Sequence, residues 1–499
     1  MLHVQQCLRP DPTLAGNNAF TGNNTFPNIN NIFVVDGVKY TTVAQALTAC
    51  QGAPLSLPGC VIDMRGNFNA AALNLGTFDP MTTSVTLLLG PTTYTVNQIK
   101  LRSSLHIYGM GAGGLSQQTI LQSCSTCSTT DMFVIGGTSP VSGIEIAHLR
   151  IYGANGNLGA TNQSALSFIA QAGGGGVWFS TFHDLNISGF NGGGGTHGVI
   201  RLDGSAGGSP PGENQFDTFR NIQANRAVGG GPILEITGIE GQLSFIDNNF
   251  DAQPSDTTGT NILIQDSAAN LFPFNIIFYN MTTQAGNVAV NTKGCNMCSF
   301  YQGHFEKSHG AFLVGPSASG TTNTTLQIQN SQFNNNVGID SGNGYLVNVT
   351  ESNLHAAVLF NGNNFGTPDA TIKGNIAGAT SYGNTGGTTV GSFLWNNNNG
   401  FPYTTINTGI LPDGSGLKHK RVPGCTTGAT SGNLCLTTVT WTTSFFDANY
   451  TVACQLVNTT ALGHLGNTGV ISAGSFQINT VTDSNHAISG TIDCIAVHD

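Results

Sequence analysis

The chain has 499 residues, of which only 8% are charged, and its formal net charge is −10 at pH 7. The chain has 15 basic residues and no basic run, which argues against binding to nucleic acid. It has no apolar run of about 18 residues, so no membrane-spanning segment is predicted. Because 39% of the residues are hydrophobic, we expect an ordered chain whose surface is polar but largely neutral.

The first 32 residues predict a leader or stalk. Residues 16–21 and 22–27 repeat a six-residue pattern, GNNAFT and then GNNTFP. One Phe per six residues cannot form a core within a single chain. The repeat therefore indicates either an unstructured leader or three chains wound together, which would bury Phe20 and Phe26 against their counterparts.

Residues 33–40 alternate apolar and polar side chains, which predicts a strand. A short amphipathic helix is expected next, with Val43, Ala46 and Leu47 at helical spacing. Such a helix would cover the open end of a solenoid, because terminal repeats need a cap. Further strands are predicted at residues 86–94, 105–111 and 119–121.

An apolar, Asn-rich unit of six residues then recurs eight times, at intervals of 22 to 37 residues. The units begin at Ile146, Phe182, Phe219, Phe245, Phe278, Phe300, Ile328 and Phe360. A repeat of roughly 20–50 residues predicts a solenoid, because one unit cannot bury its apolar face alone. Short strands joined by Gly- and Asn-rich turns make it a β-solenoid.

The positions within each unit predict which side chains face inward. The first and sixth positions are large and apolar, so we expect them in the core. The third is mostly an amide or carboxylate, which predicts a stacked column at a turn. The second and fifth positions are expected to face outward.

Three segments resemble the N-terminal part of the pectate-lyase superfamily: VDG at residues 35–37 before the helix, LLLGPTTY at 87–94, and LHIYGMG at 105–111. That superfamily of single-stranded right-handed β-helices includes phage tailspikes. The resemblance implies an all-β chain with a right-handed parallel β-helix over residues 33–395. It implies no particular activity, because the superfamily contains lyases, hydrolases and binding rods.

Residues 396–424 are predicted to be a linker, after which the pattern changes to longer alternating strands. Evenly spaced strands with turns predict a β-sandwich over residues 425–499. The stretch 440–450 and the last strand resemble the knobs of phage tail fibres and H-type lectin sandwiches. Those modules form trimers and some bind sugars, so a homotrimer is expected.

Ten of the eleven cysteines form five neighbouring pairs, namely Cys50/Cys60, Cys124/Cys127, Cys295/Cys298, Cys425/Cys435 and Cys454/Cys494. Local disulfides, free buried thiols and zinc ligation are all open from spacing alone. The two CxxC motifs are several coils apart and cannot share one ion. Disulfides would favour an extracellular environment.

The signatures of polygalacturonase-like and calcium-dependent pectate-lyase sites are missing. Asp251 and Glu306 remain as a candidate acid/base pair, because each follows the sixth position and one unit lies between them. Their backbones would stand about 9.6 Å apart, twice the strand spacing. Inverting glycosidases place two carboxyl groups about 6.5–9.5 Å apart.

We predict that the second and fifth positions of the units at 182–305 form a glycan-binding face. Its residues combine ring faces with hydrogen-bonding groups and are His183, Arg220, Asn249, Tyr279, Tyr301 and His304. No histidine spacing typical of a metal site was found, so no metal and no cofactor are expected.

The sequence therefore favours a tailspike-like spike that recognises a polysaccharide or cell-surface glycan, on a virion tail or secreted. Whether it also cleaves the glycan, as a lyase or a glycoside hydrolase, is open. The alternatives are a secreted polysaccharide-degrading enzyme and a non-catalytic structural or adhesive rod. The missing signal peptide and the fibre-like C-terminal segment favour the spike.

Overall fold

The computed structural model describes most of residues 31–334, parts of 347–396 and most of 418–498. Excluded between 31 and 334 are residues 53–58, 67–69, 82, 113–117, 157–160, 227–228, 254–255, 257–258, 307, 309, 316, 318 and 320–323. The middle part covers 347–349, 356–365, 376–377 and 392–396. Excluded between 418 and 498 are 428–432, 442–449, 458, 460–462, 473–474, 483–486 and 488. The hexapeptide repeat with Phe20 and Phe26 and most of the expected linker lie outside the described residues.

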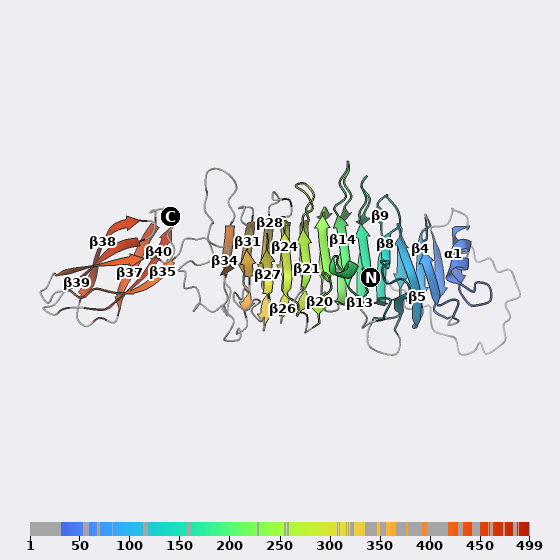
Figure 1. Cartoon of the computed structure of the whole chain (residues 1–499), viewed down its shortest axis with the longest axis horizontal. Coiled ribbons are helices and arrows are strands. Elements are labelled where there is room, and N and C mark those ends of the chain that lie inside the picture. The colour runs from blue at the N-terminus through green and yellow to red at the C-terminus, as the bar shows by residue number, and fades with distance from the viewer. Residues whose placement is uncertain are drawn as a thin grey trace, which may run out of the picture.

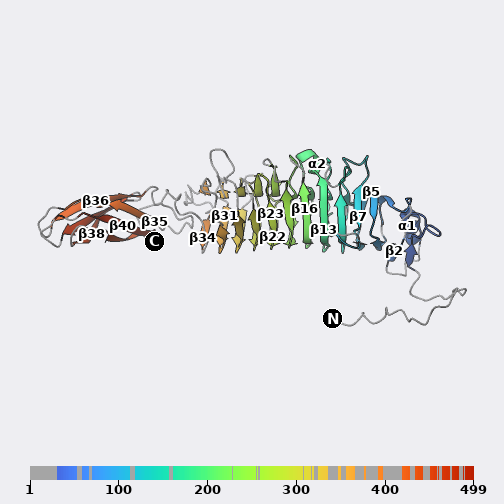
Figure 2. The same ribbon diagram turned by 90° about the horizontal axis from the view of Figure 1, so that it is seen from below.

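The strands β1 to β34 pair in parallel and form one continuous stacked system, a parallel β-helix. Most coils contribute a strand to each of three stacks, and the strands of one stack pair from one coil to the next. Strands from successive coils therefore lie side by side along the rod, as β21 and β24 do in Figure 1 and β13 and β16 do in Figure 2. The predicted solenoid is confirmed.

The first stack carries the first half of each six-residue unit. It contains β1 (Ile32–Val34), β2 (Cys60–Met64), β4 (Val85–Leu89), β6 (Leu105–Tyr108), β10 (Glu145–Tyr152), β13 (Thr181–Phe190), β16 (Thr218–Arg226), β19 (Ser244–Ile246), β22 (Phe274–Tyr279), β25 (Asn296–Tyr301), β28 (Thr324–Gln329), β31 (Ala356–Asn361) and β34 (Ser392–Asn396).

The second stack carries the second half of each unit. It contains β3 (Asn74–Phe78), β5 (Thr93–Leu101), β7 (Ile120–Ser123), the second halves of β10, β13 and β16, and then β20 (Asn249–Ala252), β23 (Thr282–Gln284), β26 (His304–Glu306), β29 (Gln332–Asn334) and β32 (Asn364–Phe365).

The third stack closes each coil. It contains the end of β5, β8 (Phe133–Ile135), β11 (Leu166–Ile169), β14 (Ile200–Gly204), β17 (Leu234–Gly238), β21 (Thr260–Gln265), β24 (Val288–Lys293), β27 (Gly310–Val314), β30 (Val347–Val349) and β33 (Ile376–Ala377). The two-residue strands β9 (Val141–Ser142), β12 (Val177–Trp178), β15 (Asn214–Gln215) and β18 (Glu240–Gly241) link it to the next coil, with the short helical turn α2 (Gly192–Gly195) after β13.

A ladder of phenylalanine rings runs through the core at the first position of the units. Neighbouring rings from Phe182 to Phe300 are stacked with centroids 4.4 to 5.1 Å apart. This is about the distance between neighbouring strands, so each ring packs on the ring of the next coil. The side chains at the first and sixth positions from Ile146 to Phe333 are buried, which confirms their predicted inward direction.

The helix α1 (Val43–Gln51) caps the first coil, as predicted, and buries Val43, Ala46 and Leu47 (Figure 1). The strand predicted at residues 33–40 is wrong in length, because β1 ends at Val34. Beyond it the carboxylate of Asp36 accepts hydrogen bonds from the amides of Val38 and Lys39, 2.9 Å each, which turns the chain.

The C-terminal residues form two three-stranded antiparallel sheets. One contains β35 (Lys418–Pro423), β37 (Tyr450–Val457) and β40 (Thr491–His498), and the other contains β36 (Leu434–Thr440), β38 (Gly463–Ser472) and β39 (Ser475–Thr482). Side chains from both sheets, including Phe476 and Ile492, share one buried cluster, as in a β-sandwich.

All five predicted cysteine pairs are disulfides, with partners 3, 10 or 40 residues apart. Cys50–Cys60 ties the capping helix to β2. Among the described residues, no helix is long and apolar enough to cross a membrane.

Candidate functional site

Each coil turns a corner at the third position of its unit, between the first and second stacks. The backbone there has a positive φ of about 50–60° in a column of seven non-glycine residues: His148, Asp184, Asn221, Asp247, Asn280, Gln302 and Asn330. Asn, Asp and His are the non-glycine types that tolerate this conformation best. Asn221 donates to Asp184 and Asn280 donates to Asp247, so the predicted amide column at the turn is confirmed.

The second and fifth positions lie on opposite sides of this corner. Tyr279 and Tyr301 are register partners on β22 and β25. Asn249 and His304 lie in the second stack, with one strand between them. The expectation of a single face is therefore corrected to two columns that flank the corner, because the bend separates the two halves of every unit.

The second-position column begins with Tyr108 and continues through Ala147, His183, Arg220, Ile246, Tyr279 and Tyr301. Arg220 is exposed and Tyr279 is 44% exposed, as predicted for outward positions. His183 is only 8% exposed, which corrects its predicted exposure. Neighbouring polar side chains, described next, cover its ring.

A cluster of titratable groups surrounds His183. Its Nε2 lies 3.1 Å from Oε1 of Glu145, and its Nδ1 lies 2.8 Å from Oδ2 of Asp184. Tyr108 donates from its hydroxyl to the other carboxylate oxygen of Glu145. Glu145 can bridge these two coils because the intervening residue in the column is Ala147, which leaves room.

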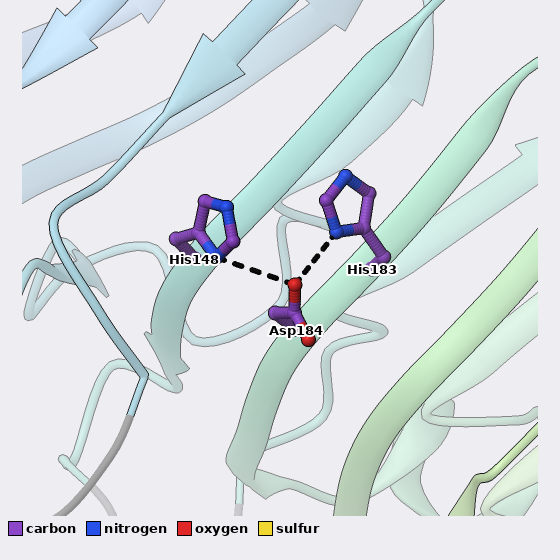
Figure 3. Close-up of side chains that lie close together, drawn as sticks. All are labelled: His148, His183 and Asp184. Atoms are coloured by element: carbon purple, nitrogen blue, oxygen red, sulfur yellow. Dashed lines mark hydrogen bonds and ion pairs between the residues drawn. The ribbon is translucent and has the colours of Figure 1, made fainter. Parts of the chain in front are cut away.

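His148 completes the cluster from the corner column. Its Nδ1 lies 3.3 Å from the same oxygen of Asp184 that His183 contacts, as Figure 3 shows. The two imidazole rings meet edge to face, with centroids 5.3 Å apart. The nitrogens of both histidines and the Asp184 carboxylate lie within 4.8 Å of one another and could hold a metal ion.

Both carboxylates of the cluster are held in the ionised form. Burial alone would raise the pKa of Glu145, but hydrogen bonds with Tyr108 and His183 outweigh it and lower the pKa. Burial acts on Asp184 in the same direction, and hydrogen bonds with Asn221 and His183 lower its pKa. Burial and the bond to Glu145 raise the pKa of Tyr108 to about 12, so its hydroxyl stays protonated.

Asp251 and Glu306 occupy the column expected for them. Asp251 is the register partner of Gln284, and Gln284 is the partner of Glu306, so one strand separates the two carboxylates. Nδ2 of Asn249 donates to Asp251 over 2.8 Å, and Nε2 of His304 lies 3.6 Å from Glu306. Two of the predicted binding residues thus contact the two predicted acid/base residues.

A second corner column presents exposed aromatic rings that sequence reasoning missed. Phe179 and Phe216 stack face to face with centroids 4.6 Å apart, and they are 59% and 41% exposed. Both have positive φ, which is costly for a bulky residue. They stand two residues before β13 and β16 begin, on the coils that carry His183 and Arg220.

The comparisons with known proteins give no family model and no curated relative that matches this chain. Among solved structures, the chain is similar to a tailspike of Acinetobacter baumannii bacteriophage Fri1, a capsular polysaccharide depolymerase. The identity is 12%, the match covers 84% of this chain and 80% of the other, and the TM-score is 0.38.

It is also similar to the tailspike of Acinetobacter baumannii bacteriophage AP22, solved in complex with capsular saccharide. The identity is 8%, the coverage is 92% of this chain and 94% of the other, and the TM-score is 0.38. The tailspike of phage phiAB6, in complex with oligosaccharides, covers 91% and 84% at 9% identity and a TM-score of 0.23.

Proposed function

We propose that this chain is a tailspike-like protein that works outside the cell and binds a polysaccharide along the outer columns of its β-helix. The observation that carries the proposal is the second-position column. It presents His183, Arg220, Tyr279 and Tyr301 in register along one side of the rod. The positions directly before them, such as Phe278, are fully buried.

The chemistry of this column suits a neutral or weakly charged glycan. A tyrosine offers an apolar ring and a polar hydroxyl, and neighbouring rings on adjacent strands repeat at about 4.8 Å. The amide and imidazole groups of Asn249 and His304 add hydrogen-bonding partners for sugar hydroxyls on the other side of the corner. The exposed pair Phe179 and Phe216 extends the stacking surface.

A glycan array with the full chain tests the binding proposal. For any polysaccharide that binds, the double variant Tyr279→Ala/Tyr301→Ala should lose about 5- to 150-fold in affinity, if each ring contributes about 0.5–1.5 kcal/mol. Ile277→Ala is the matched control, because Ile277 is also exposed on β22. Unchanged affinity in the tyrosine double variant would reject this column as the binding surface.

We further propose that Asp251 and Glu306 cleave the bound polymer by inverting hydrolysis. One carboxylic acid protonates the glycosidic oxygen as its bond to the anomeric carbon breaks. The other carboxylate takes a proton from the water that attacks this carbon. The two-strand separation, about 9.6 Å between backbones, supports this role.

Product analysis separates hydrolysis from lysis. Hydrolysis releases a new reducing end, whereas a lyase also leaves an unsaturated sugar that absorbs ultraviolet light. Asp251→Asn and Glu306→Gln should each lower the rate of reducing-end release by at least about 100-fold and leave binding in place. If both variants cleave at the wild-type rate, the catalytic pair is wrong even where binding is found.

The domain boundaries and the homotrimer predicted from the sequence belong to the same proposal. Mass photometry of the full chain should give a mass three times that of the 51.8 kDa polypeptide. A monomer would contradict the trimer and would favour the alternative of a secreted enzyme that acts alone. Binding without cleavage would favour the adhesive rod.

A further inference from the structure

The corner column breaks its own pattern at His148. The other non-glycine members from Asp184 to Asn330 are Asp, Asn or Gln, which satisfy the turn and hydrogen-bond along the stack. The backbone at this corner requires only a residue that tolerates a positive φ, and Asn occupies three other corners with that conformation. The imidazole of His148 is therefore not required by the turn.

The side chain of His148 converges with two others on one point. Its Nδ1 and the Nδ1 of His183 lie 3.3 and 2.8 Å from Oδ2 of Asp184 (Figure 3), and the three residues each offer one ligand atom within 4.8 Å of the other two. In a tetrahedral site with metal–nitrogen distances of about 2.0–2.1 Å, ligand atoms stand about 3.3 Å apart. One contact already matches, and the other needs to open by about 0.5 Å.

The groups behind these three atoms are arranged as a supporting shell. The far nitrogen of His183 lies 3.1 Å from Glu145, which is itself held by Tyr108. The far oxygen of Asp184 accepts from Asn221. Metal-binding histidines characteristically place their second nitrogen against a carboxylate, which fixes the tautomer and the ring orientation.

Both ring nitrogens of His183 have a carboxylate oxygen within hydrogen-bond distance. A neutral imidazole has one N–H and one lone pair, yet both nitrogens of His183 face a carboxylate oxygen. Oδ2 of Asp184 in addition faces the nitrogen of His148. The convergence of three ligand atoms on one point suits a metal ion.

We propose that His148, His183 and Asp184 bind a divalent first-row transition-metal ion, with Zn²⁺ as the best match to two imidazoles and one carboxylate. Three protein ligands leave a fourth position, as in catalytic rather than structural zinc sites. The side chain of His148 is 47% exposed, so this position opens toward solvent and takes water or an oxygen of a bound polymer. The proposal stands on these contacts and does not depend on glycan binding.

Calorimetry with Zn²⁺ tests the site on full-length protein that has been stripped with a chelator. Wild type should bind one ion per chain at this site, and Co²⁺ in its place should show the visible absorption bands of a low-coordinate ion. His148→Asn and Asp184→Asn should each abolish this binding event. His148→Asn is the decisive variant, because Asn221, Asn280 and Asn330 already occupy equivalent corners and the fold tolerates them.

Two further variants test the support of His183 and the specificity of the binding event. Glu145→Gln keeps all three ligands and should weaken binding about 10- to 100-fold through the lost support of His183. His464→Asn, in the C-terminal sheets, should leave the event unchanged. The proposal is overturned if wild type shows no one-per-chain event, or if the event persists in His148→Asn. Neither result bears on the glycan array, so the two proposals fail separately.

Discussion

Carboxyl groups on the outside and the inside of the β-helix have pKa values shifted in opposite directions. Outside, the hydrogen bonds of Glu145 and Asp184 outweigh burial and lower their pKa values. Inside, burial raises the pKa values of Asp217 and Glu240 well above the ordinary range, and one oxygen of each has no hydrogen-bond partner. The partners around a carboxylate, more than its residue type, decide its charge.

The opposite pKa shifts suggest different roles for the outer and the inner carboxyl groups. An ionised pair beside two histidines at the surface can attract a cation. A buried carboxyl group that stays protonated can serve the fold instead. Asp217 accepts a hydrogen bond from the amide of Ser180 over 2.8 Å, and Glu240 accepts one from Asn214 over 2.8 Å. Both bonds join neighbouring coils.

The largest effect is expected where a buried charge has a charged partner. Arg226 lies 3.0 Å from Asp256, and both side chains are completely buried. Arg226→Met should lower the free energy of unfolding by about 3–5 kcal/mol, because it leaves the Asp256 charge buried without its partner. Chemical denaturation measures this loss.

A double-mutant cycle tests whether this loss of stability comes from the Arg226–Asp256 ion pair and not from lost packing. Arg226→Met/Asp256→Ala should be much less destabilised than the sum of the two single variants. Additive losses would show that interior charges in this rod are not coupled.

A smaller effect of opposite sign is expected for the interior acids that lack a charged partner. Asp217→Asn and Glu240→Gln should each raise the free energy of unfolding at neutral pH by about 1–3 kcal/mol, because the amide removes a carboxyl group that is costly to ionise. Thermal melting at pH 7.5 tests this. Destabilisation by both variants would mean that these acids are ionised and paired in the fold.

The pH dependence of stability follows from the same raised pKa values. The native state keeps protons on Asp217 and Glu240 at pH values where the unfolded chain has released them. Stability from these groups is therefore fully present below their ordinary pKa values of 3.8 and 4.5, and it declines as pH rises above them. The advantage of Glu240→Gln over wild type should vanish near pH 4 and grow toward pH 8. An advantage that does not change with pH would contradict the raised pKa.

The sequence predicted the repeat, the capping helix and the neighbouring cysteine pairs, because each depends on spacing along the chain, but spacing alone left open whether the pairs are disulfides. The inward direction of Phe182 and Phe245 follows from the fixed spacing within a unit. The cluster at His183 could not be found in this way. His148 and His183 are 35 residues apart, the interval between units varies, and Glu145 precedes its unit, so only the stacking register brings them together.

One signal in the sequence did point to this cluster. The third position is an amide or carboxylate in most units, and His148 departs from that pattern. The second and fifth positions were predicted to form a single face, because strand alternation gives the direction of side chains but not the bend between strands. The positive φ at Asn280 makes that bend.

The smallest effect comes from a matched pair of corners, Asp184 and Asp247. Both have a positive φ of 54–55°, and each accepts a hydrogen bond from the Asn of the next unit. Asp247→Asn should change the free energy of unfolding by less than about 0.5 kcal/mol, because Asn tolerates the backbone and its carbonyl oxygen still accepts the bond. It should also leave Zn²⁺ binding unchanged, whereas Asp184→Asn abolishes it. If Asp184→Asn binds Zn²⁺ as well as Asp247→Asn does, then Asp184 is a structural corner residue like Asp247 and not a metal ligand.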